Sequence, residues 1–296
     1  MNFDEVNKQS IVANWLTKKG ITLDVLRLDK IHPVVSGNKY FKLKYYLEKA
    51  ASENKREIAT FGGAWSNHIV ATAFACKEAG LISTGFIRGE KPATLSITLQ
   101  TASDYGMQLY FVTRDEYRSK DNIKTKYEQK NILWIGEGGY GVTGAKGAAE
   151  ILKLTNTDSY THIIAAVGTG TMLAGLISSA ESHQQVIGIS SMKGNTALME
   201  EIKALMSPGE TRNPYRLFHD YHFGGYGKHP KELIDYINSV YENYSLPLDI
   251  VYTAKTFFAI EDLVRKDFFT AGSKLLMIHS GGLQGNKSLA PKVLAF

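Results

Sequence analysis

Cysteine is nearly absent from the chain: Cys76 is the single one among 296 residues, so no disulfide can form within the chain. This usage fits a reducing compartment. Cys76 ends the apolar helical run 71–76, so we expect a buried, inert thiol rather than a nucleophile. His219 and His222 have no cysteine near them in the sequence and no clear helical context, so we predict no metal site.

Long apolar runs and charge blocks are also missing. No segment approaches the roughly 18 apolar residues of a membrane helix, and the N-terminus, with Asp4 and Glu5, shows no signal peptide. The net charge is +5 without any block of five or six like charges, which argues against a nucleic-acid partner. We therefore expect a cytoplasmic protein with no membrane partner. Its mild positive surplus suits small anionic ligands.

What the chain does contain is a regular alternation of strand-like and helix-like segments. Short apolar runs predict strands at 21–28, 57–61, 82–87, 107–112, 132–135, 162–167, 186–190 and 274–279. Periodic patterns predict helices at about 39–55, 66–78, 93–105, 118–129, 143–154, 171–181, 195–206, 230–244 and 255–266. The alternation predicts an α/β protein with parallel sheets and helices on both faces.

The glycine-rich segment 136–141 separates two clusters of predicted strands and suits a hinge or a crossing segment. We therefore predict a small α/β domain at 43–140 and a large domain formed by 1–42 and 141–296. In two-domain α/β proteins the ligand commonly binds in the cleft, at the carboxyl ends of the strands.

The segment 36–45 places two lysines at the start of a predicted helix. We expect Asn38 to be the N-cap, so Lys39 lies in the first turn and Lys42 one turn further on the same face. Two ammonium groups at the positive end of a helix repel each other unless an anion or a carbonyl compound lies between them. A nucleophilic amine beside a phosphate-binding lysine has this pattern, and so does a solvated helix face.

A candidate phosphate loop, Gly168, Thr169, Gly170 and Thr171, joins the predicted strand 162–167 to a helix. Glycines let backbone amides approach a phosphate, the hydroxyls donate further bonds, and the helix dipole adds attraction. A dinucleotide-binding turn would need a third glycine where Leu173 stands. A phosphate cup explains the pattern best, with a plain strand-to-helix turn as the alternative.

A second strand–glycine–helix junction lies at 61–68. Ser66 is expected to cap the helix that follows. Amide groups at a helix N-terminus bind a carboxylate for the same physical reason that a cap stabilises them. Capping and ligand binding are therefore compatible at this junction.

Five segments, in order, resemble one enzyme family. They are Gly37-Asn38-Lys39-x-x-Lys42-Leu43-x-Tyr45, Gly62-Gly63-x-x-Ser66-Asn67-His68, Thr169-Gly170-Thr171-x-x-Ala174-Gly175, Asp249-x-Val251-Tyr252-Thr253-x-Lys255 and His279-Ser280-Gly281-Gly282. Together they are similar to the 1-aminocyclopropane-1-carboxylate (ACC) deaminases and D-cysteine desulfhydrases, which are pyridoxal-phosphate (PLP) enzymes. The resemblance implies the two-domain, tryptophan-synthase-β-like α/β fold (fold type II), PLP as cofactor, a small amino-acid substrate and a homodimer.

The resemblance also implies roles for single residues. The position of Lys39 holds PLP covalently, the Lys42 position lies at the cofactor, and the loop 168–171 binds its phosphate. The position of Ser66 lies by the reacting carbon, and that of Asn67 bonds the ring oxygen. Both Ser66 and Asn67 are expected to bind the substrate as well.

Three further positions carry open alternatives. Tyr226 and Tyr252 match tyrosines that lie near the reacting atoms, one of them against the cofactor, and simple packing is the alternative for each. His68 stands where the family often has glutamine. It is predicted either to contact the substrate or to be structural, which leaves the side-chain preference of the pocket open.

Thr253 and Ser280 bear on the reaction. ACC deaminases typically have glutamate at the first position, facing the pyridine nitrogen, and leucine at the second. D-cysteine desulfhydrase-like members have small hydroxyl residues at both. A neutral Ser280 hydroxyl at the ring nitrogen leaves a weaker electron sink than a carboxylate does, sufficient for β-elimination. We therefore predict a β-eliminating lyase, with Thr253 at the substrate. The alternatives are an ACC deaminase or another amino-acid lyase, and a PLP-binding protein with little turnover.

Overall fold

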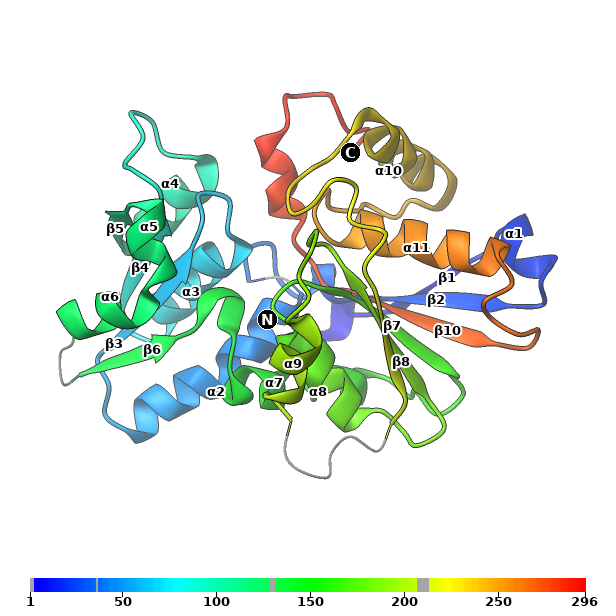
Figure 1. Ribbon diagram of the computed structural model, residues 1–296, viewed down its shortest axis with the longest axis horizontal. Coiled ribbons are helices and arrows are strands. Elements are labelled where there is room, and N and C mark those ends of the chain that lie inside the picture. The colour runs from blue at the N-terminus through cyan, green and yellow to red at the C-terminus, as the bar shows by residue number, and fades with distance from the viewer. Residues whose placement is uncertain (1–2, 36, 128–130, 207–212) are drawn as a thin grey trace.

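The computed structural model describes residues 3–35, 37–127, 131–206 and 213–296, and it contains two sheets. The larger sheet has six strands: β1 Lys8–Ile11, β2 Thr22–Arg27, β7 His162–Val167, β8 Gln185–Ser190, β9 Tyr215–Phe218 and β10 Lys274–His279. Their order is β1-β2-β10-β7-β8-β9, and every pairing is parallel except that of β1 with β2. Figure 1 shows this sheet on the right.

The smaller sheet has four parallel strands and lies on the left of Figure 1. Its strands are β3 Glu57–Gly62, β4 Ile82–Arg88, β5 Gln108–Val112 and β6 Ile132–Ile135, in the order β5-β4-β3-β6. Because all four run in one direction, their carboxyl ends meet at one edge of the sheet.

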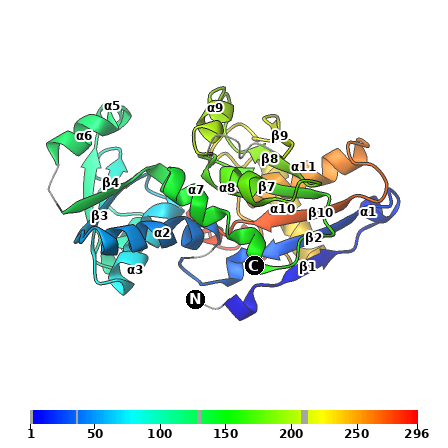
Figure 2. The same ribbon diagram turned by 90° about the horizontal axis from the view of Figure 1, so that it is seen from below.

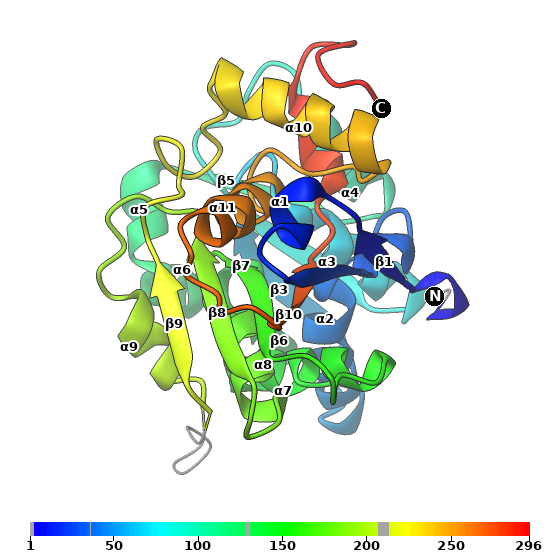
Figure 3. The ribbon, with the colours of Figure 1, turned by 90° about the vertical axis from the view of Figure 1, so that its right-hand side faces the viewer.

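Helices cover both faces of the larger sheet (Figure 3). One face packs against α1 Asn14–Thr17, α10 Lys231–Tyr244 and α11 Thr253–Arg265, and the other against α7 Val142–Ala148, α8 Thr171–Ser179 and α9 Leu198–Lys203. Within β10, Leu275 and Met277 face the first group, whereas Leu276 and Ile278 face the second. This two-residue period explains why the strand is apolar throughout: both faces are buried.

The smaller sheet is covered in the same way. Ile58 faces α2 Asn38–Ser52 and α3 Asn67–Glu78, and α4 Ile97–Asp104 packs beside α3. Phe61, on the other face, packs towards α5 Arg114–Arg118 and α6 Lys120–Lys126. The remaining helical turns are η1 Phe3–Glu5, η2 Leu28–Lys30, η3 Glu137–Gly139, η4 Ile151–Leu154 and η5 Leu283–Ser288.

Helix α2 joins the two halves, because it packs against α3 on one side and α7 on the other (Figure 2). The approach to α7 is close: a Cβ on Gly147 would lie 1.9 Å from the Phe41 carbonyl oxygen. The predicted boundary between residues 42 and 43 falls inside this helix. The division into 1–42 with 141–296 and 43–140 stays a prediction.

The predicted α/β fold with parallel sheets and flanking helices is confirmed. Two strands, β1 and β9, were not predicted. The predicted helix 118–129 corresponds to α6, which begins at Lys120, and residues 128 and 129 lie outside the described residues. The short helix α5, which ends at Arg118, was not predicted. Cys76 is buried as predicted, and burial raises the pKa of its thiol to about 12. In the described ranges, no helix has the length and apolar character needed to cross a bilayer.

The predicted N-cap of α2 is wrong. The helix begins at Asn38 itself, and the capping position is Gly37, with φ 64° and no side-chain bond. A Cβ on Gly37 would lie 1.9 Å from the Ser280 carbonyl oxygen, so the close approach of two backbones requires glycine here. Residue 36, which opens the lysine segment, lies outside the described residues.

Candidate active site

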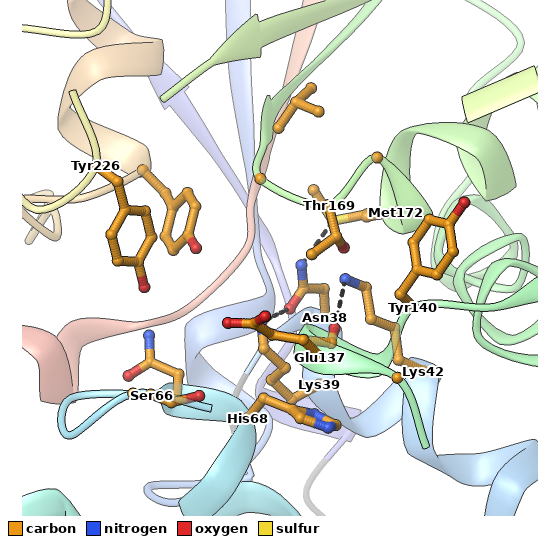
Figure 4. Close-up of a pocket in the computed structure, with 18 of the residues that line it drawn as sticks. Asn38, Lys39, Lys42, Ser66, His68, Glu137, Tyr140, Thr169, Met172 and Tyr226 are labelled. Atoms are coloured by element: carbon orange, nitrogen blue, oxygen red, sulfur yellow. Dashed lines mark hydrogen bonds between the residues drawn. The ribbon is translucent and has the colours of Figure 1, made fainter. Parts of the chain in front are cut away.

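A cavity of about 890 Å³ lies where strands of both sheets end (Figure 4). Gly63 follows β3, Gly136 follows β6, Gly168 follows β7 and Ser280 follows β10, and all four line it. Carboxyl ends of parallel strands are where α/β proteins place their ligands. The cavity is therefore the candidate active site.

The structure brings most of the predicted site residues together. Those that line the cavity are Lys39, Lys42, Ser66, Asn67, His68, Gly168, Thr169, Gly170, Tyr226, Tyr252 and Ser280. Thr171 and Thr253 are fully buried and are not among the lining residues. The two lysines and the phosphate-loop glycines, which are far apart in the sequence, thus line one cavity.

Lys39 enters the cavity from the first turn of α2. The Asn38 backbone N–H donates to the Ser280 carbonyl at 3.2 Å, which fixes the start of the helix against the end of β10. The Lys39 Nζ donates to the Asn38 side-chain oxygen at 2.7 Å. Burial lowers the pKa of Lys39 to about 8, and the Asp249 charge opposes this shift. About a tenth of the amine is therefore unprotonated at pH 7, far more than for an exposed lysine.

Lys42 lies beside it, and its Nζ donates to the Gly138 carbonyl at 3.1 Å. Burial lowers its pKa well below the usual range, and the neighbouring Lys39 charge lowers it further. Among the residues that the structure describes, neither lysine has a carboxylate partner within ion-pair distance. Two neighbouring amines without a carboxylate partner suit an anionic ligand, whose charge would favour their protonated forms.

The candidate phosphate loop lies opposite the lysines. Gly170 is the capping position of α8 and has a left-handed conformation, with φ 78°. The Thr169 and Thr171 hydroxyls lie 3.1 Å apart, so Thr171 contacts Thr169 rather than lining the cavity. The Asn38 amide also lies 3.3 Å from the Met172 sulfur, which ties the start of α2 to α8.

Ser66 and Asn67 form the start of α3. The Ser66 hydroxyl accepts from the Ile69 N–H at 3.4 Å, so the predicted N-cap is confirmed. The Asn67 amide nitrogen donates to the Gly282 carbonyl at 3.5 Å. Its carbonyl oxygen is buried and has no hydrogen-bond partner among the described residues. An unsatisfied buried acceptor at a cavity wall indicates a place for a ligand's donor group.

His68 has a defined protonation state. The Thr60 hydroxyl lies 3.0 Å from the Ile135 carbonyl, to which it donates, and 2.8 Å from the His68 Nε2. Since its one proton goes to Ile135, Thr60 accepts from Nε2–H, which leaves Nδ1 unprotonated. Burial lowers the pKa of His68 well below 6.5, and the charges on Lys39 and Lys42 lower it further. The ring is therefore neutral, and it is anchored to the sheet as well as lining the cavity.

Asp249 organises the start of α11. Its carboxylate accepts from the backbone N–H groups of Val251, Tyr252 and Thr253, each at 2.8 Å, and from the Thr253 hydroxyl at 2.6 Å. The predicted contact of Thr253 with a substrate is therefore not supported, because the hydroxyl bonds Asp249 away from the cavity wall. Tyr252, in contrast, is held at the wall by its own N–H bond.

The two predicted tyrosines form one side of the cavity. The rings of Tyr226 and Tyr252 are 6.0 Å apart in an edge-to-face arrangement, at 67° to each other. Figure 4 shows Tyr226 across the cavity from the phosphate-loop residue Thr169. Tyr226 is 49% exposed, which places it at the mouth.

Six charged residues, all within the described ranges, line the cavity but were not predicted from the sequence: Arg88, Lys120, Asp121, Lys124, Glu137 and Glu201. Glu137, in the segment interpreted as a hinge, lines the cavity and pairs with Lys120 at 3.1 Å. Arg88, the last residue of β4, also lines it. The position of Glu137 and Arg88 could have indicated them from the sequence, because each lies at or just after the carboxyl end of a parallel strand. In the described part of the chain, no three His, Cys, Asp or Glu side chains gather as a metal site would require.

Comparison with known proteins identifies this class of site. The family model described as "Pyridoxal-phosphate dependent enzyme" matches residues 18–281, and the chain belongs to that family. A Thermotoga maritima protein named "Putative 1-aminocyclopropane-1-carboxylate deaminase" is 31% identical over 90% of this chain and 91% of its own length.

Two further relatives agree. An Arabidopsis thaliana protein, "Bifunctional D-cysteine desulfhydrase/1-aminocyclopropane-1-carboxylate deaminase, mitochondrial", is 24% identical over 90% of this chain and 73% of its own length. The crystal structure of an "ACC deaminase homologue" superimposes with a TM-score of 0.81, at 26% identity, covering 95% of this chain and 90% of that one. The resemblance seen in the sequence is confirmed: the protein is a PLP-dependent enzyme of fold type II.

The residues present fit the cofactor. A phosphorylated aldehyde needs an amine with a lowered pKa, cations or amides for the phosphate, and a donor or acceptor for the ring oxygen. Lys39 would supply the amine, Lys42 with the loop 168–170 would supply the phosphate contacts, and Asn67 has an unused buried acceptor.

The pKa of Lys39 predicts how the protein free of cofactor captures PLP. An amine attacks an aldehyde only when unprotonated. The capture rate should therefore rise about tenfold per pH unit below pH 8 and level off above it. For an exposed lysine the rise would continue to about pH 10.4. Stopped-flow absorbance between pH 6 and 9.5 measures this. A rate still rising at pH 9.5 would show that burial does not perturb Lys39.

Proposed function

We propose that this enzyme eliminates the β-substituent of a small amino acid, with D-cysteine as the favoured substrate. The products would be pyruvate, ammonia and hydrogen sulfide. When bound, PLP withdraws electrons from the amino-acid Cα and so acidifies its proton. The residues around the cavity would supply binding, orientation and proton transfer.

The start of α3 is suited to hold the substrate carboxylate. The Ser66 hydroxyl and the amides of the first helical turn point towards the cavity end of the helix, where the dipole favours a negative charge. With the carboxylate fixed there and the tyrosines on the opposite side, the Cα–H bond would be held in one orientation. Orientation of the bond to be broken selects the reaction that follows.

Lys39 is the proposed base. Its pKa of about 8 allows the Nζ to take up and release a proton near neutral pH. Tyr252 and Tyr226 flank the region that the leaving group would occupy and are candidates to protonate it. Ser66 lines the same cavity, so its hydroxyl is a further candidate for donating that proton.

The observation that supports elimination is the environment of Ser280. Its side chain is 7% exposed and lines the cavity at the end of β10, whereas the Thr253 hydroxyl bonds Asp249. A neutral hydroxyl facing the cofactor ring would leave it a moderate electron sink, which is sufficient for losing a good leaving group such as a thiolate.

A second candidate is ACC deamination, and Glu137 is the observation that favours it. Its carboxylate lies inside the cavity, in the middle of the view in Figure 4. A carboxylate near the ring would strengthen electron withdrawal, which opening a cyclopropane demands. The names of the relatives include both activities.

The keto acid that each substrate releases separates the candidates. D-Cysteine gives pyruvate, whereas ACC, with one carbon more, gives 2-oxobutanoate. We expect the PLP-loaded enzyme to release pyruvate from D-cysteine at least about tenfold faster than 2-oxobutanoate from ACC. The reverse preference would make it an ACC deaminase, and no keto acid from either would refute both. A homodimer and a cytoplasmic location remain proposals.

A further inference from the structure

A buried lysine outside the cavity takes no part in the roles described so far. Lys255 lies in α11, and its side chain is 0% exposed. Its Nζ donates to the His222 carbonyl at 2.8 Å and to the Gly225 carbonyl at 2.8 Å. Within the described residues, Lys255 forms no ion pair with a carboxylate. A lysine is expensive to bury, so what it contacts is informative.

The two carbonyls belong to an irregular loop that needs external support. Phe223, Gly224, Gly225 and Gly227 all have left-handed backbone conformations, with φ between 50° and 123°. The residues between β9 and α10 form no strand or helix. Their backbone bonds are isolated turns, from the Gly225 N–H to the His222 carbonyl and from the Lys228 N–H to the Gly225 carbonyl. Such a segment keeps one conformation only when its surroundings determine it.

The base and the tip of the loop are tied to α11 differently. At the base, Tyr221 donates to Asp262 at 2.7 Å and Phe223 packs edge-on against Phe258, with ring centroids 4.9 Å apart. At the tip, the Lys255 ammonium holds the Gly225 carbonyl. The next residue in the chain is Tyr226, which carries its ring to the cavity mouth.

We propose that Lys255 is a positioning residue: by binding the His222 and Gly225 carbonyls, it fixes the Tyr226 ring against Tyr252 at the active-site mouth. Helix α11 would then place both tyrosines. Asp249 holds Tyr252 directly through the first turn, and Lys255, one turn later, holds Tyr226 through the loop. The kinetic part of this inference rests on the proposed function.

Charge strengthens the contact. Hydrogen bonds from an ammonium group to carbonyl oxygens are stronger than those between neutral groups. Burial lowers the pKa of Lys255 to about 8, and the Asp249 charge opposes that shift. Even the neutral amine retains two N–H donors for its two acceptors. The loop should therefore stay in place across the pH range of activity.

The first test is hydrogen exchange of the PLP-loaded enzyme, which needs no substrate. Lys255→Met keeps the length and apolar stem but removes the donors, and it should speed amide exchange in 222–227 at least tenfold. Lys255→Gln, which keeps an N–H donor, should lie between it and the native protein. The matched control is Lys49→Met on α2, where the lysine pairs with Glu53 at the surface and touches neither the loop nor α11. It should leave exchange in the loop unchanged.

The second test is a double-substitution cycle on kcat/KM for the amino acid turned over. Lys255→Met alone should reduce kcat/KM about tenfold, mainly through kcat. In a Tyr226→Phe background the same substitution should cost less than twofold, because the hydroxyl that the positioned ring carries is already gone. Independent effects of the two substitutions, or unchanged exchange in the loop, would overturn the proposal. If the native enzyme turns over neither D-cysteine nor ACC, the proposed function is refuted. The exchange measurement alone then tests whether Lys255 holds the loop.

Discussion

Replacing Lys39 by alanine is expected to abolish covalent attachment of PLP and to reduce turnover by more than about a thousandfold. The amine is both the proposed nucleophile for the aldehyde and the proposed base, so one substitution would remove two functions. The purified native protein should show a yellow absorbance band, and Lys39→Ala should lack it. Borohydride reduction followed by peptide mass mapping should find the label on Lys39.

Lys44 provides the matched control for this experiment. It lies on the same helix, but its Nζ pairs with Glu150 at 2.7 Å and it does not line the cavity. Lys44→Ala should therefore retain the absorbance band and most of the activity. A label found on Lys42, or a Lys39→Ala protein with native activity, would show that the nucleophile has been misassigned.

Replacing Asp249 by alanine should have the largest effect on stability. The carboxylate is 0% exposed and accepts four hydrogen bonds at the start of α11. Its removal leaves three backbone N–H groups and the Thr253 hydroxyl without their acceptor. We expect the free energy of unfolding to fall by about 3 kcal/mol. Denaturant unfolding of the protein free of cofactor, followed by circular dichroism, measures this loss.

A surface aspartate and an isosteric change calibrate that measurement. Asp235→Ala removes an exposed pair with Lys231 and should change stability by less than about 0.5 kcal/mol. Asp249→Asn keeps one acceptor oxygen and should lie between native and Asp249→Ala. Equal stability of Asp249→Ala and Asp235→Ala would mean that the capping network contributes little.

The strands were the most predictable part of the fold. The predicted segments 132–135, 162–167 and 274–279 coincide with β6, β7 and β10. Each is a short apolar run, buried on both faces. The missed strands β1 and β9 have four residues each and lie at the edges of the sheet. A half-exposed edge strand does not need an apolar pattern, so its sequence carries little signal.

Helix boundaries were less predictable, because a cap is one side-chain contact. The helix predicted from residue 93 begins at Ile97, after Ser96, whose hydroxyl accepts from the Leu99 N–H at 3.2 Å. At α2, in contrast, the sequence predicted a side-chain cap that the helix does not have. Asn38 was expected to cap, but its side chain contacts Met172 and Lys39 instead. A polar residue at a helix start has several partners to choose from, and packing selects among them.

The candidate site, like the fold, was predictable from the sequence only in part. The sequence alone located the strand–glycine–helix junctions at Gly62 and Gly168 and the lysine segment, since each is a local pattern with its own chemistry. Tertiary structure decided which side chains face the cavity. In the structure the Thr253 hydroxyl donates to Asp249, and Glu137 lines the cavity. Lys255 donates to the Gly225 carbonyl in the loop that carries Tyr226.

The physical reason lies in the range of the interactions. Backbone conformation, capping and strand period depend on neighbouring residues. The sequence therefore determined the two strand–glycine–helix junctions, at Gly62 and Gly168, and the family of the protein. The direction of a buried hydroxyl or ammonium group depends on acceptors that other elements bring to it. Those acceptors meet only when the two sheets pack, with α2 between them.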